Sequence, residues 1–385
     1  MKKIISILGS TGSIGLSALK IINQKKNSFK INILSANKNY NLICNQIKYY
    51  KPNFFVINDP HIFLKVKKKN YQKIKILNNF DNLKFKKKND ITVSAIPGLA
   101  GLLPTLIMIK KSKKLLIANK EAIICGWNLI NKESKKNKTN LTPVDSEHFS
   151  ILKLLNGHDL DEINKIYITA SGGPFYKNKL HLKKKILPKD ALKHPKWRMG
   201  KKITIDSSTL MNKILEFIEA QKLFNIDHKK LDIIIHPESL VHAIVKFKNG
   251  MTKFIYHETS MIVPLANAIF GDNFDIKYFL NKKKHNEKLE NLTFVKPNPK
   301  IFPVLKLKDR CNKFPSSSII INACNEILVD QFLKKKIPFL TISKIIMSIL
   351  KDSNYKKYAI KEPKNLNQIY KIDMWARKKT LEKIK

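Results

Sequence analysis

The first 22 residues hold the feature that most restricts the fold of this chain: an apolar run, a glycine-rich turn and the start of an amphipathic helix. Residues 4–8 are mostly aliphatic, as in a strand buried on both faces. Glycines follow at positions 9, 12 and 15, and Leu16, Leu19 and Ile22 recur at helical spacing. This order suits a turn that brings a helix N-terminus close to a pyrophosphate. It predicts a Rossmann-like dinucleotide domain, although the spacing Gly-x-x-Gly-x-x-Gly also fits an ordinary strand–helix turn.

The segment after the second predicted strand bears on the choice of dinucleotide. Residues 31–34 read as that strand, and residues 35–39 follow as Ser-Ala-Asn-Lys-Asn. A domain that prefers NAD carries an acid near here for the ribose 2′-hydroxyl. This chain carries Lys38 and no acid, which favours NADP, although Lys38 can also be one more surface lysine.

Two more strands continue the same α/β pattern. Residues 91–96 and 115–118 have the character of strands, and residues 102–109 between them have that of a helix. Asn119, Lys120 and Glu121 follow the second of these strands. Polar residues there face the ligand crevice of an open parallel sheet, so Lys120 and Glu121 are either site residues or plain surface charges.

The segment Pro-Val-Asp-Ser-Glu-His at 143–148 has the residue types of a metal site. If residues 143–147 form a strand end, Asp145 and Glu147 point to the same side, because side chains alternate along a strand. Two carboxylates aimed at one point are ligands that Mg²⁺ or Mn²⁺ prefers. A solvated turn is the competing interpretation.

Two segments of the middle region suggest an anion site and a lid. A predicted strand at 166–170 ends in Ser171 and two glycines, which offer an O–H and backbone N–H groups to an anion. The loop at 194–200 carries His194 and Trp197 and contains a proline and a glycine, Pro195 and Gly200. This loop either closes over a substrate or packs Trp197 into the core.

A helix is predicted from an N-cap at Ser207 or Ser208 to about residue 224. Its polar residues lie three or four apart and so share one face, namely Asn212, Lys213, Glu216 and Glu219. That face can hold a phosphate at the helix start and a metal one turn later, or it can simply be solvated.

The remaining chain divides into a mixed sheet and a helical end. A strand at 231–235 and a hairpin around Asn249 and Gly250 predict the sheet, and helical periodicity dominates after residue 316. We therefore expect an α/β protein with three parts. These are a Rossmann-like NADPH-binding domain at 1–145, a central α+β catalytic domain with a mixed sheet at 146–275, and a C-terminal α-helical bundle at 304–385, with a linker at 276–303.

The formal net charge of +45 over 385 residues invites a nucleic-acid interpretation, which the kind of cation argues against. All but three of the 74 cationic residues are lysine, and they are spread over the whole chain. Arginine is the favoured residue for bidentate phosphate and base contacts. We therefore do not expect nucleic acid as a partner. We do not expect a membrane either, since no apolar run reaches the roughly 18 residues of a spanning helix. The positive field still helps an acidic substrate.

The four cysteines are far apart and form no C-x-x-C pair. A zinc site or a disulfide framework is therefore not expected. We expect the protein in a reducing compartment, the cytoplasm. The apolar N-terminal run stops at Gly9, too early for a signal peptide, and is interpreted as a strand.

Seven motifs occur in one order along the chain: GSTGSIG at 9–15, NKE at 119–121, PVDSEH at 143–148, SGGPF at 171–175, HPKWRMG at 194–200, MNKxLE at 211–216 and HPxS at 236–239. Together they resemble the 1-deoxy-D-xylulose 5-phosphate reductoisomerase family of the non-mevalonate isoprenoid pathway. The resemblance covers essentially the whole chain. It implies a homodimer that uses NADPH and a divalent cation, Mg²⁺, Mn²⁺ or Co²⁺, to rearrange and reduce a small phosphorylated sugar to 2-C-methyl-D-erythritol 4-phosphate.

The resemblance also implies roles for residues that match the family's motifs. The implied metal ligands are Asp145, Glu147 and Glu216. The implied substrate contacts are Lys120, Ser146, Glu147, Ser171, His194, Ser207, Asn212, Lys213 and Glu216. The implied cofactor contacts are Thr11, Gly12, Ser13, Ile14, Asn37, Lys38, Asn39, Asn119, Glu121 and Gly200. The implied catalytic set is Lys120, Glu147, Glu216, His194 and Trp197, with Trp197 as the loop indole that covers the substrate.

The chain departs from the family pattern in a few places. It has Asn37, Ala170 and Ile214 where the family usually has glycine, and residues 259–262 lack the family's Pro-Asp-Met-Arg-like segment. None of these positions is an implied metal ligand. Two other functions are compatible with parts of the sequence: a simple NADP-dependent dehydrogenase that reduces an aldehyde without rearrangement, and a lysine-rich nucleic-acid-binding protein on a decayed enzyme scaffold.

Overall fold

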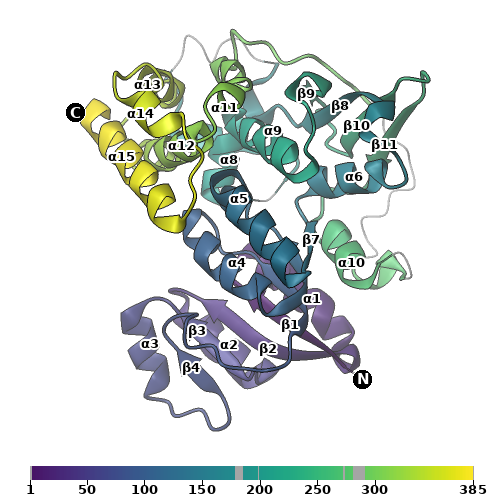
Figure 1. Ribbon diagram of the computed structural model, residues 1–385, viewed down its shortest axis with the longest axis vertical. Coiled ribbons are helices and arrows are strands. Elements are labelled where there is room, and N and C mark those ends of the chain that lie inside the picture. Colours follow the sequence, from purple (N-terminus) through teal and green to yellow (C-terminus); the bar gives the residue numbers. More distant parts are fainter. Residues whose placement is uncertain (1, 178–184, 198, 272–273, 281–290, 385) are drawn as a thin grey trace. The chain divides into compact units, whose positions relative to one another are not determined.

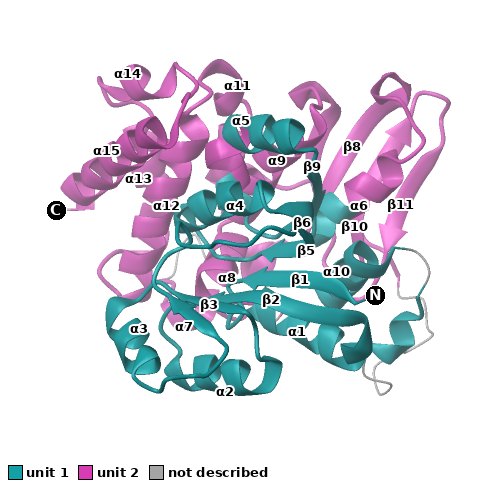
Figure 2. Ribbon diagram, turned by 60° about the horizontal axis from the view of Figure 1, so that its bottom comes forward, with its two compact units in different colours: residues 1–122, 128–149, 261–287 teal, residues 123–127, 150–260, 288–385 magenta. Residues whose placement is uncertain are grey.

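The computed structural model describes residues 2–177, 185–197, 199–271, 274–280 and 291–384. The lysine-rich residues 178–184, Arg198 and residues 281–290 of the predicted linker lie outside the described residues. The chain forms two compact units, coloured separately in Figure 2. Unit 1 comprises residues 1–122, 128–149 and 261–287, and unit 2 comprises residues 123–127, 150–260 and 288–385.

Unit 1 is built on a parallel sheet of seven strands in the order β4-β3-β2-β1-β5-β6-β7. Figure 1 labels β1 to β4 and β7, and Figure 2 labels β5 and β6. Its strands are β1 (Lys3–Leu8), β2 (Phe29–Ala36), β3 (Phe54–Ile57), β4 (Lys75–Leu77), β5 (Asn89–Ser94), β6 (Ser112–Ile117) and β7 (Asn140–Pro143). The strand order reverses beside β1, between β2 and β5. In open α/β sheets, ligands bind where the order reverses, outside the carboxyl ends of the strands. The glycine-rich turn after β1 lies at this point.

The helices of unit 1, except α10, each follow a strand of its sheet, as parallel strands require. They are α1 (Ser13–Gln24), α2 (Tyr40–Tyr50), α3 (Pro60–Lys67), α4 (Leu102–Ile109), α5 (Lys120–Asn137), which also passes through unit 2, and α10 (Ile262–Phe270). One apolar core joins strands and helices, with Ile5, Ile7 and Leu34 fully buried against Leu19 and Leu265. Gly15 lets α1 start close to the turn, since a Cβ there would lie 2.3 Å from the Gly9 carbonyl oxygen. Any larger residue at this position would push the helix away from the turn.

Unit 2 contains the predicted mixed sheet, in the order β11-β10-β8-β9. The strands are β8 (Ile163–Ala170), β9 (Leu231–Ile235), β10 (Val241–Phe247) and β11 (Thr252–Tyr256). β8 and β9 run parallel, whereas β10 is antiparallel to both β8 and β11. The hairpin turn predicted at Asn249 and Gly250 joins β10 to β11, and Gly250 has the positive φ of +89° that such turns favour.

Helices make up the rest of unit 2. Those near the sheet are α6 (Ser146–Leu155), which begins in unit 1, α7 (Pro188–Ala191), α8 (Lys201–Ser208) and α9 (Met211–Phe224). The C-terminal helices are α11 (Arg310–Lys313), α12 (Ser317–Leu333), α13 (Thr341–Ile349), α14 (Tyr355–Ala359) and α15 (Leu366–Ile384). α12 packs on α13 and α15. Among the described residues, no helix is both long enough and apolar enough to cross a membrane.

The architecture confirms the predicted fold class: a Rossmann-like parallel sheet, a second mixed sheet and a helical C-terminal region. Ala170 and Ile214, which stand where the family usually has glycine, cause no visible distortion. Ala170 continues the β8–β9 ladder and accepts a 2.7 Å hydrogen bond from the His236 N–H. Ile214 is fully buried within α9.

Candidate functional site

The turn after β1 presents the start of α1 to a ligand. Gly12 is the N-cap residue and has no side chain to cap the helix, so the first-turn N–H groups of Ser13 and Ile14 lack a side-chain partner of that kind. No acidic side chain occupies this turn. Backbone N–H groups and the positive end of the helix dipole therefore remain suited to a pyrophosphate. Thr11 to Ile14, the predicted cofactor contacts, all lie in this segment.

The predicted 2′-phosphate segment follows β2 at the same edge of the sheet. Asn39 is the N-cap residue of α2, and its side chain accepts a 3.1 Å hydrogen bond from the Leu42 N–H. Asn37 has no positive φ, so glycine is not required there by backbone conformation. Lys38 is exposed between these two residues, which leaves its ammonium accessible to an anion.

Asn119 has a structural role that the sequence does not reveal. Its side-chain oxygen accepts from the Ala122 N–H at 3.0 Å and so caps α5. Its amide nitrogen donates to the carbonyls of Ile96 and Gly98 and so ties α5 to the loop after β5. Both N–H donors of the amide are therefore used within the protein, and a side-chain contact from Asn119 to a cofactor would have to use the second lone pair of its oxygen.

Lys120 and Glu121 form the first turn of α5 and are 9% and 8% exposed. The alternative of plain surface charges is therefore wrong for both. The Lys120 ammonium lies 3.3 Å from Asp145 Oδ2. A largely buried ammonium beside a carboxylate is typical of a site rather than of a solvated surface.

The local geometry predicted for Asp145 and Glu147 is wrong. β7 ends at Pro143, and α6 begins at Ser146, so the two carboxylates do not alternate along a strand. Asp145 instead precedes the helix. Its Oδ1 accepts a 3.3 Å hydrogen bond from the Glu147 N–H and lies 3.2 Å from His148 Nδ1. The Ser146 hydroxyl donates to Glu147 Oε2 at 2.5 Å. A capping carboxylate followed by a first-turn carboxylate still offers hard oxygen ligands from adjacent positions.

The helix predicted from Ser207 or Ser208 also begins elsewhere. Both serines belong to the end of α8, and α9 starts at Met211 after Leu210, which adopts a left-handed conformation with φ of +64°. A non-glycine residue in that region is strained and persists only where the surrounding structure holds it. The turn points the start of α9 in a new direction, and Asn212 and Lys213 lie in its first turn.

The polar face of α9 is not solvated. Lys213, Glu216 and Glu219 are 7%, 1% and 1% exposed. The Lys213 ammonium lies 2.5 Å from Glu216 Oε2, and the Asn212 amide donates to Glu216 Oε1. Charged groups are almost never buried to this degree without a partner or a ligand.

Ser171 and His194 are 23 residues apart and are joined by a hydrogen bond of 2.9 Å between Ser171 Oγ and His194 Nε2. The N–H groups of Lys196 and Trp197 both donate to His194 Nδ1, at 3.2 and 2.8 Å. Nδ1 must therefore be the acceptor of a neutral ring, and Nε2 carries the hydrogen that is donated to Ser171. Burial, reinforced by the Lys213 ammonium, lowers the pKa of His194 to about 4, which keeps the ring neutral.

This arrangement orients the Ser171 hydroxyl. Its oxygen accepts from His194 and, at 3.1 Å, from the Gly173 N–H. Because both bonds use oxygen lone pairs, the hydroxyl hydrogen remains to be donated elsewhere. Gly173 has a φ of +61°, and a Cβ there would lie 3.0 Å from the Ser207 carbonyl oxygen, so the Ser171 turn packs closely on the end of α8. Ser171, His194 and Ser207 are thus brought together.

Two neighbouring serines at the end of α8 differ in their environment. The Ser208 hydroxyl is buried and donates to the carbonyls of Ala191 and Thr204, at 2.6 and 2.9 Å. Ser207 is half-buried, and its hydroxyl makes no side-chain hydrogen bond to the described part of the chain. Ser207 is therefore the residue of the pair that can serve a ligand.

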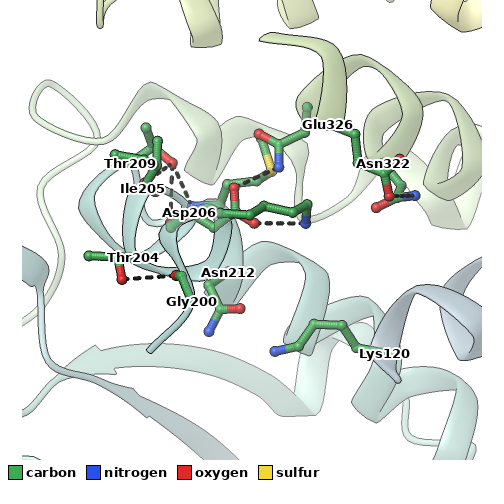
Figure 3. Close-up of polar contacts among 12 residues, drawn as sticks. Lys120, Gly200, Thr204, Ile205, Asp206, Thr209, Asn212, Asn322 and Glu326 are labelled. Atoms are coloured by element: carbon green, nitrogen blue, oxygen red, sulfur yellow. Dashed lines mark hydrogen bonds and ion pairs between the residues drawn. The ribbon is translucent and has the colours of Figure 1, made fainter. Parts of the chain in front are cut away.

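Gly200 and α8 are fixed by polar contacts within unit 2. Gly200 is the N-cap residue of α8, and its carbonyl accepts from the Thr204 hydroxyl at 3.0 Å (Figure 3). The buried Asp206 carboxylate accepts from Asn325 of α12 at 2.7 Å and lies 2.9 Å from the Lys202 ammonium. These contacts tie α8 to the C-terminal helices and hold it in place beside the Ser171 turn.

The donors present fit the groups that the sequence predicts. Asp145 and Glu147 in unit 1, and separately Glu216 in unit 2, are carboxylates of the kind that Mg²⁺ or Mn²⁺ prefers. Ser171, Ser207, Asn212 and Lys213 supply hydroxyl, amide and ammonium donors suited to a phosphate. The start of α1 supplies the backbone donors that a dinucleotide needs.

The chain is similar to proteins of one family over almost its whole length. Residues 5–126 match the 1-deoxy-D-xylulose 5-phosphate reductoisomerase profile, residues 141–224 match its C-terminal domain profile, and residues 258–379 match a DXP reductoisomerase C-terminal domain. A 1-deoxy-D-xylulose 5-phosphate reductoisomerase of Pelagibacter ubique is 47% identical over 380 residues, 97% of each chain. The chain belongs to the 1-deoxy-D-xylulose 5-phosphate reductoisomerase family.

Other members of the family support this assignment at the level of sequence and structure. The Clostridium tetani reductoisomerase is 39% identical over 96% of this chain and 97% of its own length. A crystal structure of DOX-P reductoisomerase with NADPH, fosmidomycin and magnesium has a TM-score of 0.91 at 30% identity, covering 99% of this chain and 98% of its own. The Zymomonas mobilis reductoisomerase with NADPH has a TM-score of 0.86 at 31% identity over the full length of both chains.

Proposed function

We propose that this protein is an NADP-dependent oxidoreductase that rearranges and reduces 1-deoxy-D-xylulose 5-phosphate to 2-C-methyl-D-erythritol 4-phosphate, using NADPH and a divalent metal. The observation that carries this function is the 47% identity to a reductoisomerase over 97% of the chain. The donor groups described above support the same chemistry. The product is a precursor in isoprenoid biosynthesis.

We propose Asp145, Glu147 and Glu216 as the metal ligands. When bound, a divalent metal supplies Lewis-acid stabilisation of the charge that develops on the substrate oxygens. Lys120 holds Asp145, and Lys213 holds Glu216, at 3.3 and 2.5 Å. Each lysine orients the carboxylate beside it through the ion pair.

We propose that the substrate phosphate binds among Ser171, Ser207, Asn212 and Lys213. Ser171 contributes the hydroxyl hydrogen that its bonds to His194 and Gly173 leave available. Lys213 contributes charge, and the start of α9 contributes backbone donors. Fixing the phosphate orients the reacting carbons at the other end of the substrate, where Lys120 and Ser146 are the expected contacts.

The loop that carries His194 and Trp197 is proposed to cover the bound substrate. The loop is tied to the Ser171 turn because its backbone N–H groups donate to His194, which in turn donates to Ser171. Covering the substrate would exclude water from the aldehyde intermediate until it is reduced. The half-buried indole of Trp197 suits this role better than a place in the core.

We propose that NADPH binds at the carboxyl edge of the unit 1 sheet. The start of α1, from Thr11 to Ile14, would hold the pyrophosphate. Lys38 would pair with the 2′-phosphate beside Asn37 and Asn39. The remaining cofactor contacts proposed are Asn119, Glu121 and Gly200.

We further propose a homodimer in the cytoplasm. β11 is an edge strand of the mixed sheet, and Met251, Phe254 and Tyr256 on or beside it are 53%, 48% and 37% exposed. An exposed apolar edge strand is typical of a surface that pairs with another chain. The four cysteines are free, which suits a reducing compartment.

The test is an NADPH absorbance assay with deoxyxylulose phosphate, run with and without a chelator. We expect turnover that requires metal and a nearly abolished rate in Glu216→Gln. Asp330→Asn, which removes an exposed carboxylate of α12, is the matched control and should keep the wild-type rate. Full activity of Glu216→Gln would remove Glu216 from the metal site. A simple dehydrogenase would reduce the branched aldehyde phosphate but leave the ketose untouched.

A further inference from the structure

Two imidazole rings are stacked at one end of the mixed sheet of unit 2. His242 lies in β10, and His257 directly follows β11, the neighbouring antiparallel strand. Their ring centroids are 3.8 Å apart with an interplanar angle of 16°. The β10–β11 register shifts between Val241 and Ala243, so His242 occupies an irregular position in the ladder. Such irregularities commonly redirect a side chain beside an active site.

The backbone around the stack is well determined by hydrogen bonds. The His257 N–H donates to the Leu240 carbonyl at 2.9 Å, and His242 Nε2 donates to the His257 carbonyl at 3.1 Å. His257 Nδ1 donates to the Glu258 carbonyl at 2.8 Å. The two rings are therefore held at both ends of the pair, and neither can rotate without losing a hydrogen bond.

The protonation state of His257 suits packing rather than charge. Because Nδ1 carries the hydrogen that is donated to Glu258, Nε2 of the neutral ring is a bare acceptor. This Nε2 is buried and has no hydrogen-bond partner in the described part of the chain. Burial lowers the pKa of His257 to about 4, so the ring is neutral near pH 7. A neutral ring can stack on His242 without repulsion between charges.

The other neighbour of the stack is the indole of the substrate loop. Trp197 meets His242 edge to face, with centroids 6.1 Å apart and an interplanar angle of 76°. This is a favourable geometry for two aromatic rings. The Trp197 N–H also donates to His194, so the indole and the Ser171 turn are fixed through the same short segment.

We propose that His257 is a positioning residue for the reaction. By stacking on His242, it fixes the ring that the Trp197 indole contacts. The substrate loop is thereby held near its working position before the substrate binds. The proposal rests on the proposed function, in which Trp197 covers the substrate. A loop that is ordered in advance loses less conformational entropy on binding. The effect of His257 should therefore fall on KM for the phosphorylated sugar and leave kcat and the KM for NADPH almost unchanged.

The experiment compares two substitutions at His257. His257→Phe keeps a flat ring on His242, whereas His257→Gly removes the ring. Both are made with Trp127→Phe and Trp375→Phe, which leave Trp197 as the one tryptophan of the chain. The measurements are Trp197 emission, its quenching by acrylamide, and kcat and KM for deoxyxylulose phosphate and NADPH.

We expect His257→Gly to expose Trp197 to the quencher and to raise KM for the sugar by about threefold to tenfold, the range of one aromatic pair. His257→Phe should resemble the parent in both measurements. With Trp197→Leu in place, His257→Gly should add nothing to KM. The proposal is overturned if His257→Gly leaves quenching and KM unchanged, if His257→Phe fails as His257→Gly does, or if the two effects on KM are additive.

The outcomes also separate this inference from the proposed function. If the parent protein does not turn over deoxyxylulose phosphate, the proposed function fails, and the quenching measurement alone decides whether the stack holds Trp197. If the parent is active and neither measurement responds to His257→Gly, this inference fails alone. A loss of folding in His257→Gly would be seen by circular dichroism. His257→Leu, which fills the same space without a flat ring, then replaces it in both measurements and in the Trp197→Leu comparison, with the same expected and contrary results.

Discussion

Replacing Ser171 by alanine should weaken recognition of the substrate phosphate and little else. The Ser171 oxygen accepts from His194 Nε2 and the Gly173 N–H, at 2.9 and 3.1 Å, which leaves the hydroxyl hydrogen to point at the ligand. Ser171→Ala removes that donor without adding bulk. It also leaves His194 and Gly173 each short of one acceptor, and a water molecule in the half-buried turn can replace it.

The size of the effect follows from the kind of hydrogen bond lost. A hydrogen bond to a charged group contributes about 1.5–3 kcal/mol, against about 1 kcal/mol for a neutral pair. Since about 1.4 kcal/mol corresponds to a factor of ten, kcat/KM should fall by about 10- to 150-fold. The loss should appear mainly in KM if Ser171 holds the phosphate equally in the ground and transition states.

The assay measures kcat/KM for deoxyxylulose phosphate and for the sugar without its phosphate, in wild type and Ser171→Ala. The kcat/KM of the two enzymes should differ for the phosphorylated sugar and should be the same for the sugar without its phosphate. The matched control is Ser208→Ala, which removes a buried hydroxyl that donates to Ala191 and Thr204. This variant should lose stability while it keeps its KM. An equal loss with both sugars in Ser171→Ala would refute the argument that the hydroxyl serves the phosphate.

Two further outcomes test other parts of the site. The pKa of His257 and that of His194 are both about 4 in the folded protein, against an ordinary 6.5, so only the unfolded chain gains these protons as the pH falls below about 6.5. The free energy of unfolding should therefore decrease between about pH 6.5 and pH 4, by at most about 3 kcal/mol for His257 and by less for the more solvated His194. The urea midpoint should decrease less from pH 7.5 to pH 5 in His257→Phe than in wild type. An equal decrease in the two proteins would contradict this cause. Lys38→Ala should raise KM for NADPH and leave that for NADH unchanged, because only NADPH carries the 2′-phosphate; equal changes for both cofactors would exclude Lys38 from that contact.

The fold of unit 1 was largely predictable because its signals are local. The apolar run at 4–8 became β1 (Lys3–Leu8), and the helical run at 102–109 is α4 (Leu102–Ile109). In a doubly wound sheet each strand is buried on both faces, so its hydrophobic run stands out from the polar turns that follow it. The helical end of the chain was predictable for a similar reason, except for the short α14 (Tyr355–Ala359), which spans too few turns to show a period.

The two local errors have a common physical cause. The Asp-Ser-Glu segment was interpreted as the end of a strand because Val144 precedes it, yet α6 (Ser146–Leu155) begins inside the motif. The serines at 207 and 208 have the side chains of an N-cap, yet they end α8, and Leu210 carries the chain into α9. Polar residues compete for the backbone at both ends of a helix, and a buried leucine with positive φ is maintained only by tertiary packing.

Contacts between distant segments could not be read from the sequence. Ser171 and His194 are 23 residues apart, and nothing in either motif shows that one hydrogen-bonds to the other. His257 follows a hairpin strand and has no motif around it, so its stacking on His242 emerges only once β10 and β11 are paired. Side-chain recognition across strands depends on register, which a one-residue irregularity is enough to change.

The lysines beside the proposed metal ligands give the large positive charge a local use. Lys120 lies against Asp145 and Lys213 against Glu216, and both lysines are also expected to contact the substrate. A metal bound by these carboxylates would compete with the two ammonium groups for them, and each ammonium would then be available to another anion. Since Lys213 is 7% exposed, an anion within its reach gains more than at the surface. Metal and phosphate should therefore favour each other's binding, because each takes one half of the Lys213–Glu216 pair and leaves no buried charge without a partner.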